Sequence, residues 1–187
     1  MKRKIELYPN KLFQVPFTKK TMKNYKRIAK VYTNDCLFNT LSALGLREPN
    51  ICYHDSMKMN KIKGQGVEVH DAGDYISSIF DTTIETSVKD RCKLSTITSK
   101  LKNGYATFIC GGYGYTWSDD IRGHFFIIHK ERGRLYICDP SRIIVKSGAL
   151  EKSHLIDKDL KIVVSYCNIN EIAAPLNKER MNNTIPF

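Results

Sequence analysis

The sequence predicts an α+β fold, with helices in the first part of the chain and an antiparallel sheet in the second. Two observations predict it. Apolar side chains recur at helical spacing in segments between residues 36 and 103, and from residue 106 onward short runs rich in Ile, Val, Phe and Tyr alternate with turn residues. A chain of 187 residues, 42% of them apolar, is long enough to bury one core, so we expect a single domain.

The first predicted helix covers residues 36–46, where the apolar residues form one face at a spacing of three to four. Asn34 and Asp35 stand where an N-cap belongs, and Gly45 and Pro49 bracket the end of the helix. This helix therefore begins at the first cysteine of the chain, Cys36.

A loop is expected over residues 50–66, which end in a Gly-Gln-Gly sequence. Two further helices are predicted, over residues 68–80 and 93–103, and Asn103-Gly104 closes the second of them. Strands follow, and we expect them over residues 106–110, 124–130, 135–139, 142–146 and 161–167.

Two of these strands are predicted to form a β-hairpin, in the sequence RGHFFIIHKERGRLYICDPSR. Arg132-Gly133 at its centre suits a tight turn, which places Glu131 opposite Arg134. In that register His124 lies on the same face as Asp139, diagonally across the two strands. A slip of one residue would turn Asp139 to the other face, so the register decides whether the two side chains meet.

These residues fit the chemistry of a nucleophilic cysteine. An aspartate beside a histidine holds one ring nitrogen and stabilises the imidazolium. A cysteine at a helix N-terminus, close to such an imidazolium, is favoured as the thiolate, which is the form that attacks. Cys36, His124 and Asp139 are therefore the predicted catalytic triad.

The chain resembles papain-like-fold cysteine peptidases in two motifs, NDCLFNTLSALGL and GHFFIIHKERGRLYICDP. The closest likeness is to the bacteriocin-leader peptidase domains, and the josephin and ovarian-tumour deubiquitinases are more distant. The resemblance covers about residues 30–170 and implies a papain-like fold without a cofactor or a metal. It also implies that Cys36 is the nucleophile, His124 the general base and acid, and Asp139 the group that orients the ring.

The sequence departs from the leader peptidases at two positions. Leu37 follows the cysteine where the family usually has Gly, and Lys30 stands where the family has the Gln of the oxyanion hole. We expect the side-chain amide of Asn34 to act as an oxyanion donor instead, together with the backbone N–H of Cys36.

A glycine-rich and aromatic segment, CGGYGYTWSDD at residues 110–120, comes before the proposed base. Such segments often form mobile loops over a cleft, so Tyr113, Tyr115 and Trp117 are predicted to bind substrate. An ordinary long connection is the alternative.

The net charge of +11 indicates attraction to polyanions, including non-specific association with nucleic acid, or simply a solvated basic surface. We expect a basic N-terminal arm at residues 1–31, the catalytic domain at 32–174 and a polar tail at 175–187. None of the six cysteines forms a CxxC pair, which argues against a zinc site. No signal peptide or membrane span is visible, so a cytoplasmic protein is expected, in the host cytoplasm or the virion if the chain is viral.

The predicted function is a cysteine peptidase or isopeptidase that acts on a protein or peptide through a thioester. Deamidation and transglutamination use the same triad and stay open. The alternative is a catalytically lapsed papain-like scaffold that serves as a basic structural, virion or nucleic-acid-associated protein.

Overall fold

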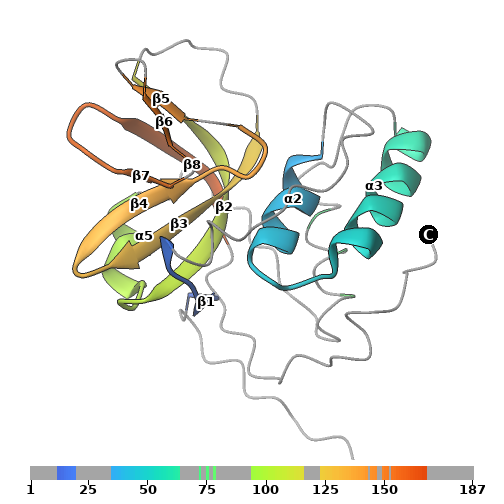
Figure 1. Cartoon of the computed structure of the whole chain (residues 1–187), viewed down its shortest axis with the longest axis horizontal. Coiled ribbons are helices and arrows are strands. Elements are labelled where there is room, and N and C mark those ends of the chain that lie inside the picture. The colour runs from blue at the N-terminus through green and yellow to red at the C-terminus, as the bar shows by residue number, and fades with distance from the viewer. Residues whose placement is uncertain are drawn as a thin grey trace, which may run out of the picture.

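The computed structural model describes positions 72, 75 and 78 and residues 12–19, 35–63, 94–115, 123–142, 144–146, 149–151 and 153–167. Helices α2 (Cys36–Ala43) and α3 (Pro49–Lys63) lie side by side next to a twisted antiparallel sheet, and α2 contacts strand β3 (His124–Glu131) (Figure 1). This arrangement confirms the predicted α+β class. Within the described residues, no helix is both long and apolar enough to cross a membrane.

The main sheet has six strands in the order β1-β2-β3-β4-β7, and β8 pairs with β2 on the edge that β1 also occupies. Strands β5 and β6 form a separate hairpin. The strands are β1 (Val15–Pro16), β2 (Tyr105–Gly114), β3 (His124–Glu131), β4 (Arg134–Cys138), β5 (Ile144–Lys146), β6 (Ala149–Glu151), β7 (Ser153–Leu155) and β8 (Lys161–Cys167).

The predicted hairpin register is confirmed. Strands β3 and β4 pair antiparallel, with Glu131 opposite Arg134. The turn residues have positive φ, 50° at Arg132 and 73° at Gly133, as a tight two-residue hairpin turn requires. The end of β4 therefore lies beside the start of β3.

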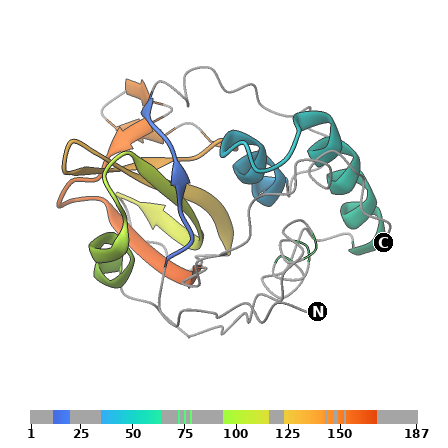
Figure 2. The ribbon, with the colours of Figure 1, turned by 90° about the horizontal axis from the view of Figure 1, so that it is seen from below.

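Helices α2 and α5 (Leu94–Lys100) lie on different sides of the sheet (Figure 2), and side chains on both of its faces are buried. On one face Phe125 and Ile127 of β3 pack against Phe38 of α2 (Cys36–Ala43). On the other face Phe126 packs in a second cluster with Ile97 of α5. Because β3 is covered on both sides, its sequence is a continuous apolar run rather than an alternating one.

The prediction of a loop over residues 50–66 is wrong, because α3 spans Pro49–Lys63. The buried side of α3 carries Cys52, Asp55, Ser56 and Met59, which recur at helical spacing. Two of these four residues are polar, and they interrupt the apolar pattern from which a helix is usually predicted.

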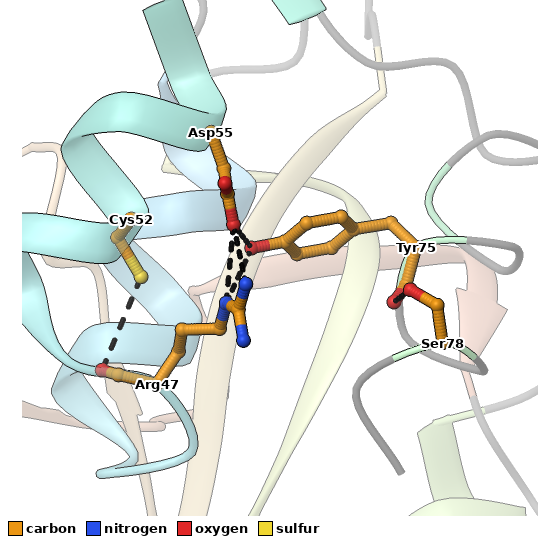
Figure 3. Close-up of polar contacts among 5 residues, drawn as sticks. All are labelled: Arg47, Cys52, Asp55, Tyr75 and Ser78. Atoms are coloured by element: carbon orange, nitrogen blue, oxygen red, sulfur yellow. Dashed lines mark hydrogen bonds and ion pairs between the residues drawn. The ribbon is translucent and has the colours of Figure 1, made fainter. Parts of the chain in front are cut away.

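Asp55 is buried because it pairs with Arg47, which follows α2 (Figure 3). Arg47 Nη2 lies 2.8 Å from Asp55 Oδ2, and both side chains are fully buried. The Tyr75 hydroxyl donates to the same carboxylate oxygen at 2.6 Å. This cluster connects Arg47, which follows α2, with Asp55 of α3 and with Tyr75, which is also helical.

The other predicted helices are matched where the structure describes them. α5 falls within residues 93–103 and is followed by the Asn103-Gly104 turn, with φ 81° at Gly104. Of residues 68–80 only positions 72, 75 and 78 are described, and all three are helical.

The structure differs from the prediction at two boundaries. Strand β2 continues through residue 114, so the first part of the segment predicted as a mobile loop is paired strand instead. Part of the predicted N-terminal arm belongs to the core, since Leu12, Phe13 and Phe17 are buried. The predicted tail at 175–187 lies outside the described residues.

Candidate active site

Cys36 is the first residue of α2 and follows the N-cap residue Asp35. Its side chain is half-buried and a free thiol. The next residue, Leu37, is buried in the core on the side of the sheet that α2 covers. The helix thus presents the sulfur at its positive end.

His124 is the first residue of β3 and is 8% exposed. Its ring stacks on Phe126, with the ring centroids 6.2 Å apart. Gly123 precedes it, and a Cβ at that position would lie 3.1 Å from Cys110 Sγ. Glycine therefore lets the chain enter β3 close to the Cys110 side chain of the neighbouring strand.

Asp139 follows β4 directly and is 2% exposed. Its Oδ2 lies 2.5 Å from Nε2 of His124, as the hairpin register predicts. Its Oδ1 accepts the backbone N–H groups of Ser141 at 2.9 Å and Arg142 at 3.1 Å, an Asx-turn arrangement. The chain folds back on the carboxylate and fixes its plane.

The electrostatics link all three side chains. Burial of the ring disfavours its charged form and acts to lower its pKa. Interactions with Asp139 and Cys36, through hydrogen bonding and charge, outweigh the effect of burial and raise the pKa of His124 to about 9. Since Nε2 faces Asp139, Nδ1 is the ring nitrogen left for the thiol. The structure therefore brings Cys36, His124 and Asp139 together.

Cys36 differs from the other three cysteines whose side chains the structure describes. Cys52, Cys110 and Cys138 are buried, and burial raises the pKa of each thiol to about 12. A thiol in such surroundings is inert.

The predicted oxyanion donor Asn34 lies outside the described residues. The first backbone N–H groups of a helix have no intrahelical acceptor, and here Asn39 N–H is bonded to Asp35 O at 3.0 Å. Cys36 is the first residue of the helix, so its backbone N–H comes before the first of these helical hydrogen bonds. This N–H lies next to the sulfur, as an oxyanion donor must.

Three aromatic residues were predicted to bind substrate. Tyr113 lies near the end of β2, and its hydroxyl donates to Oδ2 of Asp139 at 2.7 Å. The Tyr115 hydroxyl is hydrogen-bonded to His154, and Trp117 lies outside the described residues. The contact of Tyr113 with the triad was not foreseen from the sequence.

Over the described part of the chain, no group of three or more His, Cys, Asp or Glu residues has the geometry of a metal site. His129 lies on the opposite face of β3 from His124, and its Nε2 is 2.9 Å from the hydroxyl of Ser153. Neither histidine shares a metal-like cluster.

Comparisons of the chain with known protein families, curated proteins and solved structures found no match. The geometry of the site is therefore what indicates the chemistry of this protein.

Proposed function

We propose that the protein is a cysteine hydrolase, a peptidase or isopeptidase, in which Cys36 is the nucleophile. The observation that carries this proposal is the position of His124, whose Nε2 lies 2.5 Å from Asp139 Oδ2 and whose pKa is raised by interactions with both Asp139 and Cys36. A buried imidazole between a carboxylate and a thiol is the arrangement that nucleophilic cysteine catalysis needs.

The proposed reaction proceeds in two stages. The Cys36 thiolate attacks the carbonyl carbon of the scissile bond, and the negative oxygen that forms accepts the backbone N–H of Cys36. The His124 imidazolium gives its proton to the leaving amine as the C–N bond breaks, which leaves a thioester on Cys36. Neutral His124 then takes a proton from water as the water oxygen attacks the thioester. The C–S bond breaks, the carboxylic acid leaves, and the Cys36 thiolate and the His124 imidazolium are restored.

Asp139 supports both stages from behind the ring. Its carboxylate holds Nε2–H and stabilises the imidazolium, so Nδ1 stays directed at the sulfur. Because Oδ1 is fixed by two backbone N–H groups, the carboxylate does not need to reorient between stages.

A papain-like fold is part of the proposal. The order of the elements supports it: a helix that starts at the cysteine packs on an antiparallel sheet whose strands supply the histidine and then the aspartate. Leu37, which stands where the leader peptidases usually have glycine, is a buried core residue of α2 here. The net charge of +11 would suit substrates or surroundings rich in acidic groups.

Alkylation by iodoacetamide at pH 6, followed cysteine by cysteine with peptide mass spectrometry, tests the proposal. An ordinary free thiol is only ~0.3% ionised at that pH, so a thiolate held by an imidazolium should react about 100-fold faster. We expect Cys36 to be alkylated at least that much faster than Cys52, Cys110 and Cys138.

His124→Ala should remove most of this difference, whereas His54→Ala, at an exposed histidine of α3, should leave it unchanged. If Cys36 reacts no faster than the buried cysteines, the proposal is wrong, and a catalytically lapsed scaffold becomes the better description. If His124→Ala has no effect, Cys36 is reactive for another reason and the triad is not the active unit.

A further inference from the structure

We propose that Tyr113 is a positioning residue of this site, whose hydroxyl binds Oδ2 of Asp139 and moderates the hydrogen bond between that oxygen and His124. Its hydroxyl oxygen lies 2.7 Å from Oδ2, the same oxygen that faces His124 Nε2 at 2.5 Å. This inference rests on the proposed function, because it assigns a role within the same triad.

The sheet brings Tyr113 to this place. Gly111 of β2 is paired with His124 of β3, and Tyr113 is two residues further along β2, hence on the same face and diagonal to His124. Gly111 has no side chain, so nothing stands directly across from the imidazole on that strand. The phenol therefore has a path past the start of β3 to the end of β4.

Packing fixes the direction of the phenol. The Tyr113 ring meets Phe126 edge to face, with centroids 5.1 Å apart, and its centroid lies 6.5 Å from that of His124. Tyr113 is also paired with Ile162 of β8, next to a register shift between Cys110 and Gly111. An irregularity of this kind re-aims the side chains that follow it, which suits a residue at the edge of a site.

The carboxylate of Asp139 accepts four hydrogen bonds, about as many as its lone pairs allow. Two backbone N–H groups hold Oδ1, and the phenol and the imidazole share Oδ2. Burial, followed by the neighbouring Asp139 charge, raises the pKa of Tyr113 well above its usual range, so the hydroxyl stays a donor at every working pH. A donor on Oδ2 draws charge from that oxygen and moderates its hold on the imidazolium.

Tyr113→Phe isolates this effect because it removes only the oxygen. Without the phenol, Oδ2 becomes a stronger acceptor for the imidazolium, so the pKa of His124 should rise above its wild-type value. The neutral ring is then scarcer at pH 7, and hydrolysis of the acyl enzyme should slow by about 2- to 10-fold, the range that one hydrogen bond accounts for. Alkylation of Cys36 at pH 6, which needs no proton transfer, should be unchanged.

Two measurements on the full chain test the role. The first is the titration of the His124 ring by NMR. The second is the steady-state hydrolysis of p-nitrophenyl acetate after the acylation burst, with the Cys36→Ala rate subtracted. Tyr105→Phe is the matched control, since Tyr105 lies in the same strand and packs in the same cluster but at the far end of β2.

The positioning role is supported if Tyr113→Phe raises the pKa of His124 and slows hydrolysis while Tyr105→Phe does neither. It is overturned if the His124 titration and the hydrolysis rate of Tyr113→Phe equal those of the wild type, and in that case the proposed function still stands. It is also overturned if Tyr113→Phe reduces alkylation and hydrolysis alike without moving the titration, which would mean a structural role only. A failure of the proposed function would be recognised separately, by slow alkylation of Cys36 in the wild-type chain.

Discussion

Two histidines of one strand show how local surroundings decide the chemistry of a residue. His124 and His129 are both buried, five positions apart on opposite faces of β3. His124 faces the carboxylate of Asp139, and its pKa is raised to about 9. His129 faces the hydroxyl of Ser153, and burial lowers its pKa to about 4. Alternation along a strand is enough to put positions 124 and 129 on opposite faces, whereas the burial of both faces depends on what packs against the sheet.

His129 is expected to make the fold sensitive to acid. In the unfolded chain the ring has its ordinary pKa of 6.5, so it takes up a proton below that pH. In the folded chain its pKa is about 4, so it takes up a proton only below about pH 4. The unfolded state therefore binds more protons between these values, and the free energy of unfolding falls as the pH decreases through that window, by up to about 1.4 kcal/mol per pH unit.

His129→Phe tests this expectation by urea unfolding at several pH values from 4 to 7. Phenylalanine keeps the ring stack on Tyr136 and removes the titrating group. The variant should lose stability less steeply than the wild type between pH 6.5 and 4. Parallel curves for the two proteins would show that His129 is not the titrating group.

At the scale of elements, the sequence was most informative where a turn and an apolar pattern agreed. Arg132-Gly133 set the turn, and a two-residue turn at that position fixes which residues of the flanking strands lie opposite one another. Helix α3 could not be predicted in the same way, because Asp55 occupies a core position and its partners, Arg47 and Tyr75, lie outside the helix. A buried ion pair is visible in the fold but not in a local pattern.

The pair between Arg47 and Asp55 is expected to hold α3 onto α2. Asp55→Ala leaves a buried guanidinium without its carboxylate and should lower the free energy of unfolding by about 3–5 kcal/mol. Tyr75→Phe removes only the hydroxyl that donates to Asp55 and should cost about 1 kcal/mol.

Chemical unfolding of the two single variants and of Arg47→Met with Asp55→Leu measures these effects. The double variant removes both charges together, so it should be considerably more stable than Asp55→Ala. A loss below about 1 kcal/mol for Asp55→Ala would contradict a structural role for the pair, since that is the size of an ordinary surface change.

At the scale of the whole molecule, the candidate site depends on three segments that are far apart in the chain. The sequence predicted the order of Cys36, His124 and Asp139 and the contact between the last two. The approach of Cys36 follows from the packing of α2 on β3, which no spacing along the chain specifies. The contact of Tyr113 escaped prediction for a related reason, since it depends on β2 running past the start of β3.

Titration of the His124 ring by NMR, in the wild-type chain and in Cys36→Ala and Asp139→Asn, is the most direct test that the three side chains act as a unit. The wild-type ring should titrate near pH 9. Both variants should titrate at lower pH, because each removes a hydrogen-bond partner that favours the imidazolium. A wild-type midpoint below about 7 that neither substitution moves would be that of an unperturbed histidine, and it would contradict the triad.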